Sequence, residues 1–399
     1  MPQLTVAVVG AGIAGLAFAA ALRRAGVACD LYERTGRLAE VGAGVQLAPN
    51  ATRLLRRLGL RDSLRDFAVT PRAIEMRRWD DGALLHRTPL GDDCDRRFGA
   101  PYYTVHRADL HSALLSLVPP GQVHLGARCV SVTQDADRAR LHLSDGTTVT
   151  ADLVVGADGI RSVVREEIAD DEPRHSGQTI YRGLVPADRV PRALAEPGVR
   201  LWFGPDQHCV CYPVSAGRQV SFGATVTAAG RGEESWSARG DTAELAAAYK
   251  GWHDDVVALI DAADTVGRWA LYDRDPVARL SAGRVAVIGD AAHPMLPFQA
   301  QGANQAIEDA VVLAACLARA RPDRPGAALR RYEQARLPRT ARIQQQSRAN
   351  ARTFHLADGE AQRERDATDR TAPGLDRHAW LFGYDAEQAV TTSWSPSWN

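Results

Sequence analysis

Three glycines near the N-terminus have the spacing that lets a peptide backbone hold a pyrophosphate. Gly10, Gly12 and Gly15 lie between a predicted strand at 4–9 and a predicted alanine-rich helix. The first glycine allows a tight turn, the second lets a phosphate approach the N-terminus of the helix, and the third lets that helix pack on the strand. Glu33 ends the next predicted strand, where its carboxylate can accept hydrogen bonds from both ribose hydroxyls of an adenosine. The pattern predicts a dinucleotide site without a 2′-phosphate.

Two more turns follow buried strands later in the chain. Residues 156–162 (GADGIRS) carry Asp158, and residues 289–294 (GDAAHP) carry Asp290 just past the carboxyl end of a predicted strand. Ligands of α/β proteins bind at the carboxyl ends of parallel strands. A predicted helix begins near residue 302, and its unpaired N–H groups and positive dipole end can face an anion. Both turns are expected to contribute to the nucleotide site, although either aspartate alone could simply close an Asx turn.

A predicted strand at 207–213 carries the side chains most suited to substrate chemistry. Alternation along a strand places His208, Val210 and Tyr212 on one face. A histidine whose pKa lies near neutrality can accept a phenolic proton, directly or through water. Phe222, on the next predicted strand, is a weaker candidate for the same wall. The alternative is that these residues are half-buried and have no role in chemistry.

In order and spacing, the three motifs resemble those of the group A flavoprotein monooxygenases, the family of para-hydroxybenzoate hydroxylase and salicylate hydroxylase. The resemblance covers residues 2 to about 340. It implies that FAD is held by residues from all three motifs and from the segments beside them. These are Gly10, Gly12, Ala14, Gly15, Glu33, Arg34, Gln46, Arg107, Asp158, Asp290, Gly302, Ala303 and Asn304.

The resemblance also implies roles for individual residues. Asp158 is expected near the pyrophosphate and the approach of the nicotinamide cofactor, and Asp290 is expected to bind the ribityl chain. Arg107 matches an arginine on the cofactor side, and Pro294 matches a proline that lies against the isoalloxazine near the reacting oxygen. His208 would act as the base that accepts the proton of a ring hydroxyl.

Two stretches narrow the resemblance to the branch that contains salicylate hydroxylase and 6-hydroxynicotinate 3-monooxygenase. Residues 42–50 (GAGVQLAPN) are similar to a loop that runs beside flavin and substrate, and some hydroxypyridine enzymes have a histidine where Gln46 aligns. The pair His208 and Tyr212 is similar to the substrate-contacting pair of the branch, and His208, Tyr212 and Pro294 are therefore the predicted catalytic residues. The predicted substrate wall consists of Gln46, His208, Val210, Tyr212, Phe222 and Pro294.

The activity implied is hydroxylation of a small aromatic ring by a single-component FAD enzyme. NADH or NADPH would reduce FAD, and reduced FAD would capture O2 as a flavin hydroperoxide that attacks an electron-rich hydroxybenzoate, aminobenzoate or salicylate-like ring. CO2 would leave if the attack falls on the carboxyl-bearing carbon. The alternatives are the same chemistry on a larger phenolic or polyketide intermediate, a flavin-dependent halogenase, and a flavoprotein that does not hydroxylate. A halogenase would need Lys250, the only lysine, which lies away from every flavin motif.

The order of predicted elements gives the fold class that must position these residues. Nucleotide-binding motifs occur early, midway and late, which predicts an α/β fold with a Rossmann-like FAD-binding domain interleaved with a mostly antiparallel β-sheet substrate domain and a helical C-terminus. One of the predicted helices covers 160–168. The expected division is an FAD-binding domain at 1–70, 100–172 and 281–340, a substrate domain at 71–99 and 173–280, and a C-terminal helical segment and tail at 341–399.

Composition excludes several classes of protein. Forty-eight basic and 48 acidic side chains give zero net charge, so the chain offers no broad cationic field for nucleic acid or an acidic membrane surface. Six scattered cysteines without a CxxC pair predict reduced thiols and no metal site. The first predicted strand begins almost at the first residue with no apolar leader, which favours a cytoplasmic protein. Neither a monomer nor a homodimer is excluded, and Trp394 and Trp398 could cover an interface or simply trail.

Overall fold

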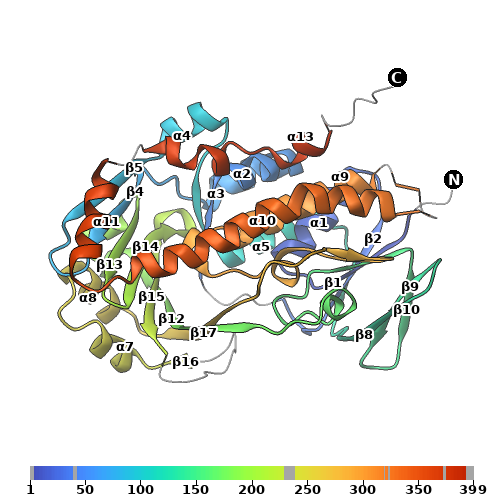
Figure 1. Cartoon of the computed structure of the whole chain (residues 1–399), viewed down its shortest axis with the longest axis horizontal. Helices are drawn as coiled ribbons and strands as arrows, with labels where there is room; N and C mark the ends of the chain where they lie inside the picture. The colour runs from blue at the N-terminus through green and yellow to red at the C-terminus, as the bar shows by residue number, and fades with distance from the viewer. Residues whose placement is uncertain are drawn as a thin grey trace.

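The computed structural model describes residues 4–38, 43–228, 239–318, 320–321, 324–371 and 374–391 (Figure 1). Two sheets, one parallel and one antiparallel, lie at opposite ends of the molecule. The long helix α10 (Gly326–Phe354) runs from the first sheet toward the second. Trp394 and Trp398 lie outside the described residues. No helix among the described residues has the length and apolar character that crossing a membrane requires.

The parallel sheet is built around β1, the first strand of the glycine-rich motif. All four residues of β1 are buried because helices cover one face and a three-stranded meander covers the other. The order of its strands is β18 (Ser281–Ala282), β19 (Val285–Val287), β11 (Leu153–Gly156), β1 (Val6–Val9), β2 (Cys29–Glu33) and β7 (Val123–Leu125). The pairing is parallel except between β18 and β19. The interleaved order predicted from the three motifs is therefore confirmed.

Helices α1 (Ile13–Arg24) and α9 (Gly302–Leu317) pack against each other over the parallel sheet. The opposite face is covered by β8 (Cys129–Gln134), β9 (Ala139–Leu143) and β10 (Thr148–Ala151). Both helices are rich in alanine on their buried sides, which allows close approach. Their N-termini consequently lie at the carboxyl end of the sheet, where the ligand crevice of this fold is found.

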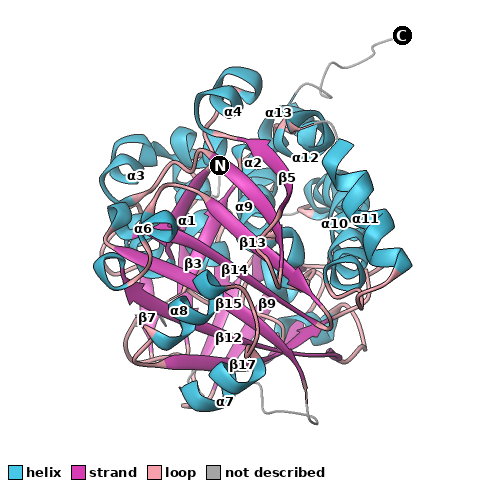
Figure 2. Ribbon diagram, turned by 90° about the vertical axis from the view of Figure 1, so that its left-hand side faces the viewer, coloured by secondary structure: helices cyan, strands magenta, loops and turns pink. Residues whose placement is uncertain are grey.

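The antiparallel sheet has eight strands and lies at the other end of the molecule (Figure 1), and its strands face the viewer in Figure 2. Their order is β16 (Arg239–Gly240), β17 (Val266–Asp273), β12 (Arg174–Pro186), β15 (Gln219–Thr227), β14 (Gln207–Val214), β13 (Val199–Gly204), β4 (Ala73–Arg78) and β5 (Leu84–Pro89). Only β13 and β4 pair in parallel within it. Helices α6 (Arg192–Ala195), α7 (Thr242–Ala248) and α8 (Asp254–Asp261) close one face over a core that includes Leu194, Leu245 and Val256.

The remaining elements connect the two sheets or cover their edges. Strands β3 (Gly44–Leu47) and β6 (Tyr103–His106) form a two-stranded ribbon between them. The helices are α2 (Pro49–Leu55), the π-helical turn η1 (Arg56–Leu60), α3 (Arg61–Phe67), α4 (Gly91–Phe98), α5 (Arg107–Leu115), α11 (Glu360–Thr371), α12 (Ala379–Phe382) and α13 (Ala386–Thr391). Short 3-10 turns occur at η3 (Ala187–Arg189), η4 (Ser215–Gly217), η5 (Gly289–Ala291), η6 (Pro297–Gln299) and η7 (Leu375–His378).

The predicted helix at 160–168 is wrong, since only a 3-10 turn, η2 (Val164–Glu167), forms there. Gly159 has a left-handed backbone, φ +83°, which directs the chain away from a helical path. The Asp158 carboxylate accepts hydrogen bonds from Val163 N at 2.9 Å and Val164 N at 3.4 Å. The first turn therefore begins several residues later than apolar periodicity suggests.

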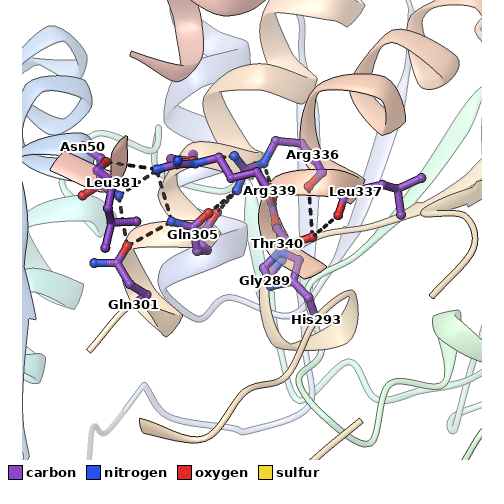
Figure 3. Close-up of polar contacts among 12 residues, drawn as sticks. Asn50, Gly289, His293, Gln301, Gln305, Arg336, Leu337, Arg339, Thr340 and Leu381 are labelled. Atoms are coloured by element: carbon purple, nitrogen blue, oxygen red, sulfur yellow. Dashed lines mark hydrogen bonds and ion pairs between the residues drawn. The ribbon is translucent and has the colours of Figure 1, made fainter. Parts of the chain in front are cut away.

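A network of buried charges joins α9 to α10 (Figure 3). Arg336 is fully buried and contacts both Glu308 and Asp309, with its Nε 2.7 Å from an Asp309 carboxylate oxygen. Arg339 adds a second contact to Glu308 at 2.7 Å, and His293 Nε2 lies 2.5 Å from Asp309. Asp309 also accepts a hydrogen bond from Gly289 N at 2.8 Å. The network thereby ties the turn that carries Asp290 to both helices.

Candidate active site

The glycine-rich turn at the start of α1 has the shape that a bound pyrophosphate requires. Gly10 has φ +101°, and a Cβ there would lie 2.5 Å from the carbonyl oxygen of Ala157. A Cβ on Gly15 would overlap the carbonyl of Gly10, so the helix could not pack as it does. At Gly12 a Cβ would meet nothing within 4 Å, and no side chain caps the helix. The N-terminal N–H groups of α1 can therefore donate to a phosphate.

Glu33 lies at the end of β2, beside this turn. One carboxylate oxygen accepts a hydrogen bond from Ala11 N at 2.9 Å, and the other accepts from Thr35 N at 3.0 Å and from its hydroxyl at 3.1 Å. These contacts fix the carboxylate and leave lone pairs for the hydroxyls of a ribose. The next residue, Arg34, is exposed and makes no hydrogen bond or ion pair with the described residues.

Asp290 and the start of α9 lie together on the other side of the crevice. A carboxylate oxygen of Asp290 lies 4.0 Å from the position of a Cβ on Gly302. The carboxylate is surrounded by protein yet open to solvent, as expected for a group in a recess. Burial raises the pKa of Asp290, and the charges of His293 and Arg107 partly oppose that change. The first turn of α9 has no side-chain cap, so its N–H groups, including that of Ala303, can face an anionic ring.

Asn304 and Asp158 use their side chains to hold the scaffold. The amide of Asn304 accepts from Ala48 N at 2.8 Å and donates to the carbonyls of Gln46 at 2.9 Å and Ala300 at 2.8 Å. Asn304 therefore joins α9 to β3, and only its backbone N–H remains for a ligand. The Asp158 carboxylate is occupied by Ser162 Oγ at 2.5 Å as well as by the N–H groups of the 3-10 turn.

Pro294 and Ala14 are held by packing and by α10. The carbonyl of buried Pro294 accepts a hydrogen bond from Gln344 Nε2 at 3.1 Å. Ala14 packs against Gly289, where an added Cβ would lie 2.9 Å from the Ala14 methyl group. Gly289 and Pro294 flank Asp290 in the chain. The contact with α1 fixes Gly289, and the hydrogen bond from α10 fixes Pro294.

Tyr212 and Gln46 meet at the boundary between the two sheets. Gln46 accepts a hydrogen bond from Tyr102 Oη at 2.7 Å and also faces the phenol of Tyr212. Burial raises the pKa of Tyr212 to about 12, although Arg182 and Gln46 act in the opposite direction. Tyr212 is therefore a neutral hydrogen-bonding phenol. Gly44 allows this approach, because a Cβ there would lie 2.7 Å from Ser221 Oγ and would overlap the Tyr212 ring.

His208 lies on the same face of β14 as Tyr212, within an aromatic cluster. The ring of His208 packs on Phe298 and Phe354, with centroid distances of 5.0 Å and 5.5 Å. Its Nδ1 is 2.8 Å from His355 Nε2 and 3.1 Å from the Thr225 hydroxyl. No hydrogen bond to Nε2 is found within the described part of the chain, which leaves that nitrogen for a ligand. Burial, reinforced by His355, lowers the pKa of His208 well below its usual value, so the imidazole is neutral.

Acid is expected to destabilise the fold through this histidine pair. Burial lowers the pKa of His355 to about 4, against 6.5 for an unperturbed histidine. Between these values the unfolded chain binds more protons, so the free energy of unfolding decreases as the pH falls through this window. From pH 7.5 to pH 5 the wild type should lose about 2 kcal/mol more than His355→Phe in urea unfolding. An equal loss in both proteins would contradict this assignment.

Of the predicted wall, Gln46 faces Tyr212, and His208, Val210 and Tyr212 share one face of β14, but Phe222 does not lie with them. Residues paired directly across neighbouring strands share a face, and Tyr212 pairs with Ser221 while Phe222 pairs with Cys211. Phe222 therefore points to the opposite face, where it packs in the core under α7 and α8. Val210 and Tyr212 pack together on the site face.

Three residues that contact His208 were not predicted from the sequence. Phe354 ends α10, His355 follows it directly, and both contact His208 from far along the chain. Phe298, in the 3-10 turn between Pro294 and α9, also contacts His208. No sequence motif lies near His355 or Phe354, so nothing in the sequence indicated that they belong to the site. The closeness of Phe298 to the third glycine motif was the one available indication.

The described residues include no group of three or more His, Cys, Asp or Glu side chains that could hold a metal ion. All six cysteines are buried free thiols. Burial raises the pKa of Cys29 and Cys211 to about 12, so neither is a reactive thiolate near neutral pH. The polar groups suited to chemistry are therefore those of the crevice and the wall of β14.

Comparison with known proteins agrees with this geometry. Residues 3–347 match the protein family described as FAD binding domain. The chain is 50% identical over 381 residues to a 3-amino-4-hydroxybenzoate 2-monooxygenase of Streptomyces platensis, covering 96% of each chain. It is 37% identical to a 6-hydroxynicotinate 3-monooxygenase of Bordetella bronchiseptica, covering 95% of each. A solved substrate complex of salicylate hydroxylase matches with a TM-score of 0.83 and 29% identity, covering 100% of this chain and 99% of that one.

These likenesses confirm the activity that the three motifs predict. The chain is an aromatic hydroxylase that uses FAD, O2 and a reduced nicotinamide cofactor. The crevice fits FAD, since Gly12 leaves room for a phosphate and two uncapped helix N-termini face the recess of Asp290. The chain belongs to the FAD-binding domain family and, within it, to the flavoprotein aromatic monooxygenases.

Proposed function

We propose that the substrate is 3-amino-4-hydroxybenzoate or a close analogue, hydroxylated at ring carbon 2 with retention of the carboxyl group. The observation that carries this proposal is the polar wall of His208, Tyr212 and Gln46, which lies between the antiparallel sheet and the cofactor crevice. Such a wall suits a small ring with several polar substituents. The ring itself is suggested by the 50% identity to proteins of Streptomyces platensis and Streptomyces cremeus that are named 3-amino-4-hydroxybenzoate 2-monooxygenases.

The position of attack decides which substituent activates the ring. Carbon 2 is ortho to the amino group and meta to the hydroxyl, so the amino lone pair supplies the electron density. Bound FAD, once reduced by the nicotinamide cofactor, would activate O2 for transfer of one oxygen atom to the ring. As the carbon–oxygen bond forms, positive charge develops on the amino nitrogen, and this makes its proton acidic. A weakly basic, neutral imidazole is then sufficient, and we assign His208 Nε2 to accept that proton.

The wall also keeps water away from the reacting atoms. His208 is 4% exposed and Tyr212 is 7% exposed, and Phe298 packs against the histidine. Tyr212 and Tyr102, joined through Gln46, present neutral phenols that can donate to or accept from substrate substituents. We assign Pro294 to the cofactor side, where its rigid ring would limit movement of the flavin.

We propose that residues 1–70, 100–172 and 281–340 bind FAD and that 71–99 and 173–280 enclose the substrate, with 341–399 forming a C-terminal helical segment and tail. We also propose that the enzyme acts in the cytoplasm on a small aromatic acid, as a monomer or homodimer, without a nucleic acid or membrane partner.

A substrate panel tests the identity of the ring. FAD-loaded enzyme would be mixed with NADH or NADPH and with 3-amino-4-hydroxybenzoate, 3-hydroxybenzoate, salicylate or 6-hydroxynicotinate. We expect the highest kcat/KM and the least hydrogen peroxide with 3-amino-4-hydroxybenzoate. Efficient coupled turnover of another ring, with only peroxide formed from this one, would contradict the proposed substrate.

A further inference from the structure

One arginine on the substrate-facing side of the antiparallel sheet has no counter-ion. Arg182 lies on β12, where it pairs with Gly223 of β15, and Gly223 pairs in turn with Val210 of β14. Directly paired residues share a face, so Arg182 lies on the same face as Val210 and therefore as Tyr212 and His208. Its side chain belongs to the wall that faces the cofactor crevice.

The surroundings of Arg182 enclose its charge without neutralising it. The guanidinium lies 5.8 Å from the centre of the Trp269 ring and faces the neutral phenol of Tyr212. The like charge of Arg107 is also close enough to act on it. Within the described chain, no carboxylate and no hydrogen bond to the guanidinium is found. By contrast, the enclosed guanidinium groups of Arg165 and Arg336 each contact a carboxylate.

An enclosed guanidinium without a counter-ion is costly unless a ligand supplies the negative charge. Its planar fork matches a carboxylate, with two parallel N–H···O bonds. We propose that Arg182 binds the carboxylate of the aromatic substrate. This inference rests on the proposed function, since it requires that the substrate be an aromatic acid.

The geometry of the sheet fits a ring between Arg182 and His208. One strand separates Arg182 from Val210, so their Cα atoms are about 10 Å apart. The intervening residue, Gly223, has no side chain, and a Cβ there would lie 3.2 Å from Ile180 and 3.5 Å from Val210. A carboxylate held at Arg182 leaves the amino and hydroxyl groups pointing along the wall toward His208. The anchor would therefore determine which ring carbon faces the cofactor.

The test compares Arg182→Gln with wild type on the acid and on its neutral amide, 3-amino-4-hydroxybenzamide. Loss of a charge-assisted carboxylate contact should raise KM for the acid about 100-fold, while KM for the amide changes little. Arg182→Lys, which keeps the charge but loses the fork, should raise KM for the acid about 10-fold. FAD content should remain unchanged in both variants.

Arg268→Gln is the matched control, since Arg268 lies on the neighbouring strand β17 and packs over Tyr181 on the opposite face. It should leave both KM values near those of the wild type. If the wild type binds neither acid nor amide, the proposed substrate is wrong. If it turns over the acid and Arg182→Gln retains the same preference for acid over amide, the role of Arg182 is overturned while the function stands. Should the glutamine variant not fold, equal KM changes for acid and amide in Arg182→Lys would also overturn it.

Discussion

Replacing Arg336 by leucine is expected to lower the free energy of unfolding by about 3–5 kcal/mol. The substitution removes the cation that contacts both Glu308 and Asp309, and all three side chains are fully buried. Arg339 would still contact Glu308, and His293 would still contact Asp309, but one guanidinium would no longer offset two desolvated carboxylates. Urea unfolding with excess FAD measures the loss.

The exposed Arg330 lies on the same helix, so Arg330→Leu is the matched control and should change stability by less than about 0.5 kcal/mol. Adding Asp309→Asn to Arg336→Leu should restore part of the loss, because one of the uncompensated charges disappears. A loss of less than about 1 kcal/mol in Arg336→Leu would show that the buried network contributes little to the fold.

Replacing His208 by glutamine is expected to lower kcat for hydroxylation by about 100-fold or more, because the group that we propose as the proton acceptor is lost. FAD affinity should remain unchanged, since His208 lies on the antiparallel sheet and contacts Phe298, Thr225 and His355 rather than the glycine-rich turns. Stopped-flow measurements separate flavin reduction from oxygen transfer. A larger share of reduced cofactor should end as hydrogen peroxide.

The control for this experiment is His142→Gln. His142 lies on β9, which belongs to the three-stranded sheet and not to the sheet that carries His208. The variant should retain both turnover and coupling. Normal kcat and coupling in His208→Gln would remove His208 from the mechanism and restrict its role to packing against Phe354.

The parts of the fold that follow local rules were predictable from the sequence. Any side chain at Gly10 or Gly15 would clash with neighbouring atoms, so the spacing of these glycines correctly predicted the tight turn between β1 and α1. Alternation correctly placed Val210 and Tyr212 on one face of β14. The position predicted for Phe222 was wrong, because alternation shows which residues of one strand share a face but not how that strand pairs with its neighbour. Phe222 pairs with Cys211, and its side chain therefore packs under α7.

Contacts made across long sequence separations were not predictable. The hydrogen bond between His208 and His355 depends on where a 29-residue helix ends. The enclosure of Arg182 depends on Trp269 and Tyr212, which come from two other strands of the sheet. The role of Asp158 could not be predicted for a different reason. A carboxylate that follows a strand can cap a turn or bind a ligand, and the sequence pattern is the same in both cases. In the structure Asp158 caps the 3-10 turn.

Isotope labelling measures directly whether an oxygen atom of O2 is transferred to the ring. Purified FAD-loaded enzyme would be supplied with 3-amino-4-hydroxybenzoate, NADH or NADPH, and ¹⁸O-labelled O2, and the product would be analysed by mass spectrometry and NMR. We expect a product with one labelled oxygen atom at ring carbon 2 and the carboxyl group retained. Label found only in hydrogen peroxide and water, or a product that has lost its carboxyl group, would contradict this expectation.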